Sequence, residues 1–403
     1  MKRWQKLLLL LLALLICSQI PFAYRRYRLG RLSDAIQQIN SQRQPKPDEK
    51  FVEYKGVLHV HSFLGGHSAG NFEEIIAAAK TNQLNFVVMT EHTSSNFNTA
   101  AMTLKDFHGD VLFINGNELS VSTKERLLVF PGDETGSLPE GLSIADVLAR
   151  GKARNALVLV AYPEDFKSWN VEGYDGVEVY NVYTNARSIN AVGMFFDALW
   201  SYRSYPDLLF ANFYTHPTAS LNLWDDAIRT SGKRLVATAG NDAHANVGVS
   251  LNDASGKSWI GFKADPYERS FRLVRMHLLL PTGEVLSTPN LLQAFDAGHC
   301  FIGFDLFGDT TGFRFTATNG NEQKIQGDEI SVGGGVTLSV TVPVSSRIVL
   351  LKDGGTFRDE TGVSQKQYVV TEKGSYRVEV YLPQLPGRVG AQPWIISNPI
   401  YVR

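Results

Sequence analysis

Short apolar runs alternate with amphipathic segments between about residues 57 and 300. The apolar runs have the length of strands, and the run 156–161 is wholly apolar, as in a parallel strand buried on both faces. Helices are expected after Asn71 and Ser143, because each is a typical N-cap that precedes apolar residues three or four apart. Repeated strand–helix units predict a parallel α/β sheet or barrel. The expected strands are 58–61, 86–90, 111–114, 156–161, 177–180 and 235–239.

The hydrophobic period changes to two after about residue 310. Apolar and polar residues alternate over 336–342 and again over 376–382, so each segment is expected to be a strand with one apolar and one polar face. Asn319-Gly320 and Asp353-Gly354 are typical of hairpin turns. This pattern predicts a small antiparallel β-sandwich over residues 306–403.

The amino terminus has the pattern of a membrane signal. Three basic residues precede an apolar run over 7–17, and only Ser18 and Gln19 interrupt its apolar character as far as Ala23. About 17 residues is the lower limit for a helix that spans a bilayer. No small-residue cleavage site follows, so residues 1–30 are expected to be an uncleaved anchor, with a cleaved secretory signal as the alternative. Either places the protein in the cell envelope, exported, membrane-anchored or periplasmic. Basic residues on both sides leave the orientation open.

Residues 31–54 are polar and contain Pro45 and Pro47, which stop a helix. This stretch is expected to be a linker.

Charge and cysteine content narrow the chemistry. The 39 basic and 40 acidic residues nearly balance, so no electrostatic attraction to nucleic acid is expected. Cys17 and Cys300 are too few for a disulfide framework, and Cys300 is expected to have no disulfide partner. A metal site would have to use histidine and carboxylate ligands.

Histidines and carboxylates gather at the ends of the expected strands. His59 and His61 are one residue apart on a strand, so both side chains are expected on one face, where they can chelate one ion. Active sites of α/β barrels form at the carboxyl ends of parallel strands. Four strands therefore bring metal ligands to one rim, which predicts a metal site. The other strand-end residues are Glu91 and His92, Glu118, and Asp242 and His244.

These residues also carry a resemblance to a known family. The chain resembles the polymerase-and-histidinol-phosphatase (PHP) family over about residues 55–245, and its carbaryl-hydrolase-like branch through 176–181 and the closing 393–402. The resemblance implies a distorted seven-stranded β/α barrel over 55–305 that holds two or three divalent metals, Zn, Mn or Fe, and hydrolyses phosphoesters. The matching motifs are Leu58-His59-Val60-His61-Ser62, Thr90-Glu91-His92, Asn115-Gly116-Asn117-Glu118 and Gly240-Asn241-Asp242-Ala243-His244.

The same resemblance implies how the ligands are shared. The first metal would take His59, His61, Glu118 and Asp242, and a second would take His67, His92 and His244. Glu118 would bridge the first metal to the remaining, third one.

Two positions depart from the family pattern. Tyr162 precedes Pro163 where the family has a ligating histidine, and tyrosine is a poor ligand at neutral pH. His216 precedes Pro217 and is a further candidate ligand, with a structural role as the alternative. Glu91 replaces the usual aspartate and could support a neighbouring ligand without touching the metal.

The sequence thus predicts a metal-dependent hydrolase in which a metal-activated water attacks a phosphorus or carbonyl centre, with no side-chain nucleophile. A phosphomonoester or phosphodiester is the first choice of substrate, and a carbamate or other small-molecule ester is the alternative. A metal-stabilised envelope binding module without catalysis is the hypothesis from another class. Structural roles are expected for His108, His277 and His299, which have no carboxylate at suggestive spacing.

Overall fold

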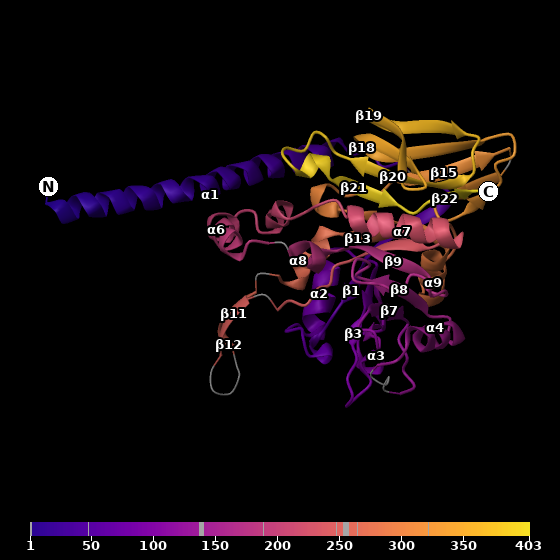
Figure 1. The fold of residues 1–403 in the computed structure, drawn as a ribbon, viewed down its shortest axis with the longest axis horizontal. Coiled ribbons are helices and arrows are strands. Elements are labelled where there is room, and N and C mark those ends of the chain that lie inside the picture. Colours follow the sequence, from indigo (N-terminus) through magenta and orange to yellow (C-terminus); the bar gives the residue numbers. More distant parts are fainter. Residues whose placement is uncertain are drawn as a thin grey trace.

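Two large β-sheets form the body of the protein (Figure 1). The computed structural model describes residues 2–46, 48–136, 141–187, 189–246, 248–252, 258–263, 265–320 and 322–403. Within these residues the fold is mixed α/β, with a 14-stranded sheet, a six-stranded sheet and a two-stranded hairpin of β11 (Gly248–Asn252) and β12 (Ser258–Lys263).

The N-terminal part of the larger sheet carries the first histidine motif. Three of its strands are parallel: β1 (Phe51–Val60), β2 (Phe86–Met89) and β5 (Val111–Ile114). On the other side, β13 (Arg275–Pro281) pairs antiparallel with β1, and β14 (Cys300–Gly303) pairs with β13. The short β4 (Asp106–His108) closes the edge at β5.

The six-stranded sheet is mixed, which corrects one expectation. Strand β8, predicted as a purely parallel strand, pairs parallel with β9 but antiparallel with β7. The reason is that β6 and β7 form an antiparallel pair, which places β7 between β6 and β8. In order, the sheet contains β10 (Val236–Gly240), β9 (Gly176–Asn181), β8 (Leu157–Ala161), β7 (Arg126–Phe130), β6 (Asn117–Ser120) and β3 (Glu91–His92).

The two sheets meet at both ends. The chain passes from β2 to β3 and from β5 to β6 almost without a break. At the other end, a parallel bridge joins Val60 after His59 to Ala243 beyond β10, and the His61 amide donates to the Ala243 carbonyl at 3.1 Å. The ends of β1, β3, β6 and β10 therefore lie around one centre.

Helices cover these sheets, and the expected caps are present. The Asn71 side chain accepts from the Glu74 amide at 2.8 Å, and Ser143 accepts from the Asp146 amide at 3.1 Å. The helices are α2 (Phe72–Thr81), α3 (Thr99–Met102), α4 (Ile144–Ala153), α5 (Val182–Ala186), α6 (Ala191–Ser201), α7 (Thr218–Ser231), α8 (Tyr267–Leu273) and α9 (Thr288–Ala297), with short 3₁₀ turns η1 (Phe63–Gly65), η2 (Asp207–Asn212), η3 (Asp305–Phe307) and η4 (Val389–Ala391).

The C-terminal strands continue the larger sheet. The period of two is confirmed in β18, where residues 336–342 alternate between buried and half-buried, and Asp353-Gly354 forms the two-residue turn to β19 with φ of 49° and 83°. Strand β21 pairs with β14, so hydrogen bonding runs across the expected boundary at 305/306. The strands are β15 (Arg314–Asn319), β16 (Glu322–Ile325), β17 (Glu329–Ile330), β18 (Val336–Lys352), β19 (Gly355–Val370), β20 (Gly374–Tyr381), β21 (Pro393–Ser397) and β22 (Ile400–Val402).

Both faces of β20 are buried, although its sequence alternates. Arg377 and Glu379 stand on the face that the pattern makes polar, yet both are buried. Helix α7 covers that face, and Asp225 on this helix lies 3.0 Å from the Arg377 guanidinium. The polar residues of β20 therefore join the C-terminal strands to α7.

Helix α1 (Arg3–Gln42) is a single long helix that projects from the body (Figure 1). Among the described residues it alone is long and apolar enough to cross a membrane, which is compatible with either a signal anchor or a signal peptide. The helix includes residues 31–42 of the expected linker, with Leu32 and Ile39 buried, and β1 begins at Phe51.

Candidate metal centre

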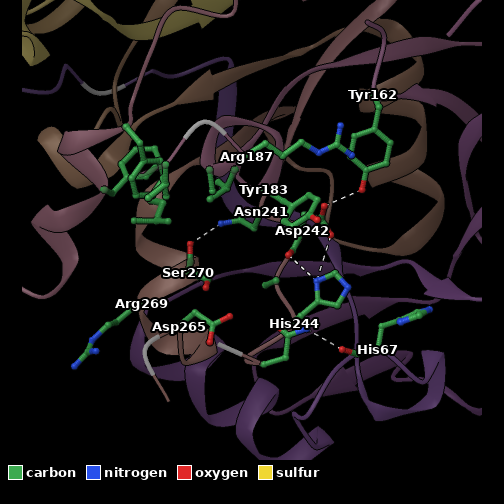
Figure 2. Close-up of a pocket in the computed structure, with 18 of the residues that line it drawn as sticks. His67, Tyr162, Tyr183, Arg187, Asn241, Asp242, His244, Asp265, Arg269 and Ser270 are labelled. Atoms are coloured by element: carbon green, nitrogen blue, oxygen red, sulfur yellow. Dashed lines mark hydrogen bonds and ion pairs between the residues drawn. The ribbon is translucent and has the colours of Figure 1, made fainter. Parts of the chain in front are cut away.

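Irregular backbone at three strand ends directs polar side chains to the common centre. Strand β1 has a register shift at His59, whose φ is 66°. Tyr162 and Asp242 also have positive φ, at 48° and 47°. Such left-handed residues other than glycine are uncommon and gather at functional sites. Asp242, His244 and Tyr162 converge on the wall of one pocket (Figure 2). His59 and His61 do lie side by side, as expected, but through a bulge and not through regular alternation.

Four buried side chains form the first group. The Glu118 Oε2 atom lies 3.3 Å from His59 Nε2 and 3.4 Å from His61 Nε2. The Asp242 Oδ1 atom lies 3.6 Å and 3.5 Å from the same two nitrogens. Two ligands about 2.1 Å from one tetrahedral zinc would be about 3.4 Å apart, so these spacings match those of ligands that share an ion.

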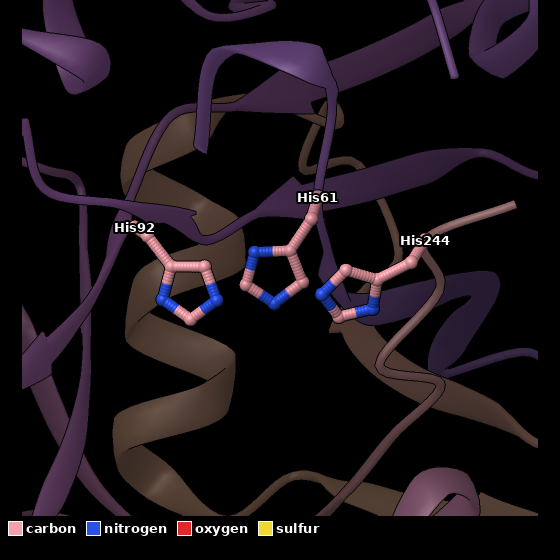
Figure 3. A group of neighbouring side chains, drawn as sticks. All are labelled: His61, His92 and His244. Atoms are coloured by element: carbon pink, nitrogen blue, oxygen red, sulfur yellow. The ribbon is translucent and has the colours of Figure 1, made fainter. Parts of the chain in front are cut away.

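Three imidazoles form a second, overlapping group (Figure 3). The His61 ring stacks between His92 and His244, with ring centres 4.6 Å and 4.3 Å away, and one nitrogen from each ring lies within 4.8 Å of the others. The His92 Nδ1 atom is 3.6 Å from Glu118 Oε2, which connects this group to the first. His67 approaches from its loop and packs edge-on against His92, 5.0 Å away.

Three of the candidate ligands have pKa values shifted toward the unprotonated form that binds a metal. Burial raises the pKa of Glu118, but hydrogen bonding and charge from His59 and its neighbours outweigh burial and lower it to about 2. Burial acts on Asp242 in the same way, and the charges of His59 and His61 again hold its pKa well below the usual range. Burial lowers the pKa of His92 to about 3. Ionised carboxylates and a neutral imidazole are the forms that bind metals.

Unsatisfied polar atoms at the centre also fit a metal. Both ring nitrogens of His61 and the Oδ1 atom of Asp242 are buried, and none of the described residues forms a hydrogen bond with them. Leaving such groups unpaired is costly, and a divalent cation in contact with them would remove that cost. The donor set of imidazoles and carboxylates suits zinc, manganese or iron.

Glu178 is a site residue that the sequence reasoning missed. Its Oε1 atom lies 2.7 Å from His59 Nδ1, and the side-chain amide of Asn181 donates to its Oε2 atom at 2.9 Å. A metal-ligating histidine commonly has such a carboxylate at its second nitrogen. Gly240 leaves the space for this contact, since a Cβ there would lie 1.8 Å from Glu178 Oε1. A carboxylate inside the otherwise apolar segment 176–180 was the available signal.

Two further side chains support the ligands. Arg126, also missed, begins β7 and places its guanidinium 3.3 Å from Glu118 and 3.4 Å from His92 Nδ1. Glu91, the expected supporting carboxylate, accepts from the Ser62 amide at 3.0 Å and from the Thr103 hydroxyl at 2.8 Å. Glu91 thereby holds the turn that follows His61.

The two uncertain candidates have different positions. The Tyr162 hydroxyl donates to Asp242 Oδ2 at 2.8 Å, and burial together with the nearby carboxylates raises the pKa of this tyrosine, so it remains a neutral donor. His216 does not join the group. Its Nε2 atom lies 3.0 Å from Glu379 and its Nδ1 atom 2.8 Å from the Thr218 hydroxyl, because it stands where α7 meets β20.

The histidines expected to be structural lie elsewhere. His277 and His299 do have carboxylate partners, but these come from distant parts of the chain: Glu53 and Asp305 for His277, and Asp328 for His299. His108 lies 3.2 Å from the Lys105 carbonyl.

The centre opens into a pocket of about 780 Å³ (Figure 2). Basic and acidic side chains both line the pocket, and Arg187 also lies over the rings of Tyr162 and Tyr183. Away from the centre the walls are mostly apolar. The basic residues that line it are Lys124, Arg126, Arg187 and Arg269.

Comparison with known proteins does not identify a family for the chain. No family model and no curated protein matches the chain. The solved structure of PsfC from Pseudomonas syringae PB-5123 is similar, with 14% identity, coverage of 60% of this chain and 88% of that chain, and a TM-score of 0.34. A likeness at this level supports neither a fold nor a function for the chain.

Proposed function

We propose that the protein is a metal-dependent hydrolase and, most specifically, a phosphoesterase. The observation that carries this proposal is the pair of overlapping histidine–carboxylate groups at the base of a pocket that Arg126 also lines. We further propose membership of the PHP family, on its ordered motifs. The circuit of strands β1, β2–β3, β5–β6, β7, β8, β9 and β10, closed by the Val60–Ala243 bridge, supports the distorted seven-stranded barrel.

The proposed division of the ligands is the one that the motifs imply. His59, His61, Glu118 and Asp242 would hold one metal, and His92, His244 and His67 would hold another, with Glu118 close to both. His61 lies near both sets, since it also groups with His92 and His244. A third metal would lack a histidine where Tyr162 stands, and His216 lies apart from the group. Divalent metals, when bound, supply an activated water and positive charge for the developing oxyanion.

The chain's own residues would orient the substrate. Arg126 points into the pocket beside Glu118, where a guanidinium can contact two oxygens of a phosphate. The Tyr162 hydroxyl holds Asp242 in place and keeps its proton at neutral pH. The Arg126 guanidinium beside the centre favours an anionic phosphoester over an uncharged carbamate, and carbamate or ester hydrolysis is the alternative.

The domain assignment is likewise a proposal. It comprises an anchor over 1–30, a linker over 31–54, the barrel over 55–305 and a β-sandwich over 306–403. The antiparallel pairing of β15, β18, β19 and β20 supports the last domain.

A metal analysis joined to a substrate panel tests the function. The purified full chain should contain tightly bound Zn, Mn or Fe and hydrolyse a generic phosphomonoester or phosphodiester, with activity lost in chelator and restored by metal. Asp242→Ala should lose metal and activity, whereas His108→Ala should keep both.

Three results would oppose the proposal. Carbamate hydrolysis without phosphoester hydrolysis would favour the alternative, and bound metal without turnover of any substrate would favour a binding module. Full activity in Asp242→Ala would contradict the metal assignment.

A further inference from the structure

Helix α6 packs against α1 where the apolar part of α1 ends. The Phe22 and Phe196 rings lie 5.0 Å apart, and the indole of Trp200 donates to Gln19 at 3.1 Å. One helical turn later, Arg25 forms an ion pair of 2.7 Å with Asp197. These contacts fall on both sides of Ala23, the last residue of the apolar stretch. If α1 spans a bilayer, α6 lies at the level where α1 leaves the hydrocarbon.

Helix α6 is apolar toward solvent as well as toward the protein. Val192, Phe195 and Leu199 stand on one face and are 68%, 63% and 69% exposed. A helix that is apolar on more than one side is expected to be surrounded by apolar material. Trp200 on α6 and Tyr24 and Tyr27 on α1 are also exposed, as aromatic residues are at a membrane interface.

The other side of α6 forms a wall of the pocket. Met194 and Ala198 line the cavity, together with Phe210 of η2 and Leu273 at the end of α8. The same cavity reaches His244 and Asp242 at its polar end. One cavity thus joins the candidate metal centre to the helix that carries the exposed apolar face.

We infer that α6 lies in the membrane interface and that the pocket takes an amphipathic phosphoester from the bilayer, with its head at the metal centre and its apolar chain against Met194 and Ala198. The inference rests on the proposed function and adds the substrate class. The bilayer is the occupant of the exposed face because α1, packed on the same helix, would enter that bilayer at the same level.

The first experiment locates the exposed face of α6. In a Cys17→Ser background, Phe195→Cys and, separately, Leu199→Cys are labelled with a fluorophore, and the full chain is reconstituted into vesicles that contain brominated lipid. Both labels should be quenched by the bromines and protected from aqueous iodide. Val285→Cys is the matched control, because Val285 is 72% exposed but lies in the turn between β13 and α9. The label at position 285 should be quenched by iodide and not by the bromines. Iodide access at both α6 positions, or protection without bromine quenching, would overturn the inference in favour of a wet face or a protein partner.

The second experiment measures the chain-length preference. Alkyl p-nitrophenyl phosphodiesters with 2 to 12 carbons are offered to the metal-loaded protein in lipid nanodiscs. We expect kcat/KM, calculated on the total substrate concentration, to rise by up to about fourfold for each added methylene, because each one favours transfer from water into the disc and the apolar end of the pocket. Met194→Asp should reduce the ratio of long-chain to short-chain kcat/KM, and Val285→Asp should leave that ratio unchanged. Since partition into the disc is common to all variants, the difference between them reports on the pocket.

The outcomes separate the two proposals. Turnover of the short diester with a flat chain-length series, or a series that Met194→Asp does not alter, would overturn the substrate class alone. Failure to hydrolyse any member in metal-loaded protein would overturn the proposed function and, with it, this inference.

Discussion

At the scale of single residues, His59 and Asp242 are expected to act on one ion. Their nearest atoms, Nε2 and Oδ1, are 3.6 Å apart, and both are buried. His59→Ala and Asp242→Ala should each lower activity by at least about 100-fold, since even residues that only support a ligand cost about 10- to 100-fold. The activity of the double variant should be only slightly below that of the less active single variant, because either substitution alone already loses the ion.

Metal content by mass spectrometry and activity on a phosphodiester check this prediction, with circular dichroism to verify folding. His108→Ala is the control. Losses that multiply in the double variant would mean that the two residues serve different functions.

Glu178 gives a second residue-scale prediction. Burial tends to lower the pKa of His59, but the charges of Glu178 and Asp242 outweigh it and raise that pKa, so removing one charge weakens the imidazole as a ligand. Glu178→Gln should lower metal affinity by about 10- to 100-fold while the fold persists. Competition with a chromophoric chelator measures the affinity. Glu172→Gln, on the exposed surface, should show no change.

The positions of the candidate metal ligands were easier to predict from the sequence than the side chains that hold those ligands in place. His59 lies within an expected strand, and Glu118 and Asp242 follow others, so their convergence could be expected from strand order alone. Glu178 touches His59 across 119 sequence positions, and His216 meets Glu379 across 163. Such partners depend on which strands become neighbours, which local patterns do not determine.

At the scale of elements, His277 joins β13 to β1 and to the turn η3. Its imidazole contacts Glu53 at 2.8 Å and Asp305 at 3.3 Å, and it is fully buried. Burial lowers the pKa of His277, but the two carboxylates outweigh burial and raise it from 6.5 to about 9. Between these values the folded protein holds a proton that the unfolded chain releases, so the free energy of unfolding falls as the pH rises.

We therefore expect a pH-dependent contribution of about 3 kcal/mol, fully present below pH 6.5 and lost as the pH passes about 9. His277→Gln should be less stable than the wild type at pH 6, and the gap should narrow by pH 9.5. Thermal unfolding followed by intrinsic fluorescence at both pH values measures it. A gap that is equal at the two values would show that the imidazole is neutral in the folded protein.

Element types were easier to anticipate than their neighbours. The expected helix caps at Asn71 and Ser143 and the turn at Asp353-Gly354 are local, and all three are confirmed. The mixed pairing of β8 and the burial of Arg377 on β20 were not foreseen, because each depends on a non-local partner, β7 or α7.

At the scale of the whole molecule, the amino-terminal helix decides where the protein resides. A helix that spans a membrane is removed only by detergent. The full chain should therefore sediment with membranes and should not be extracted by alkaline carbonate. Mass spectrometry of the purified protein should give the intact 44.7 kDa chain. A shorter, freely soluble chain that begins after residue 23 would instead identify a cleaved signal.

Helix α1 continues from its apolar end into the body, where Leu29, Leu32 and Ile39 are buried, and this continuity has a kinetic consequence. If α1 spans a bilayer, this continuous helix would fix the height and tilt of the body above the bilayer, in contrast with a flexible tether. Encounters with a lipid-borne substrate would then occur by lateral diffusion in two dimensions. The rate should follow the mole fraction of substrate in the surface, and diluting the surface with inert lipid should slow turnover even when the bulk concentration of substrate is held constant.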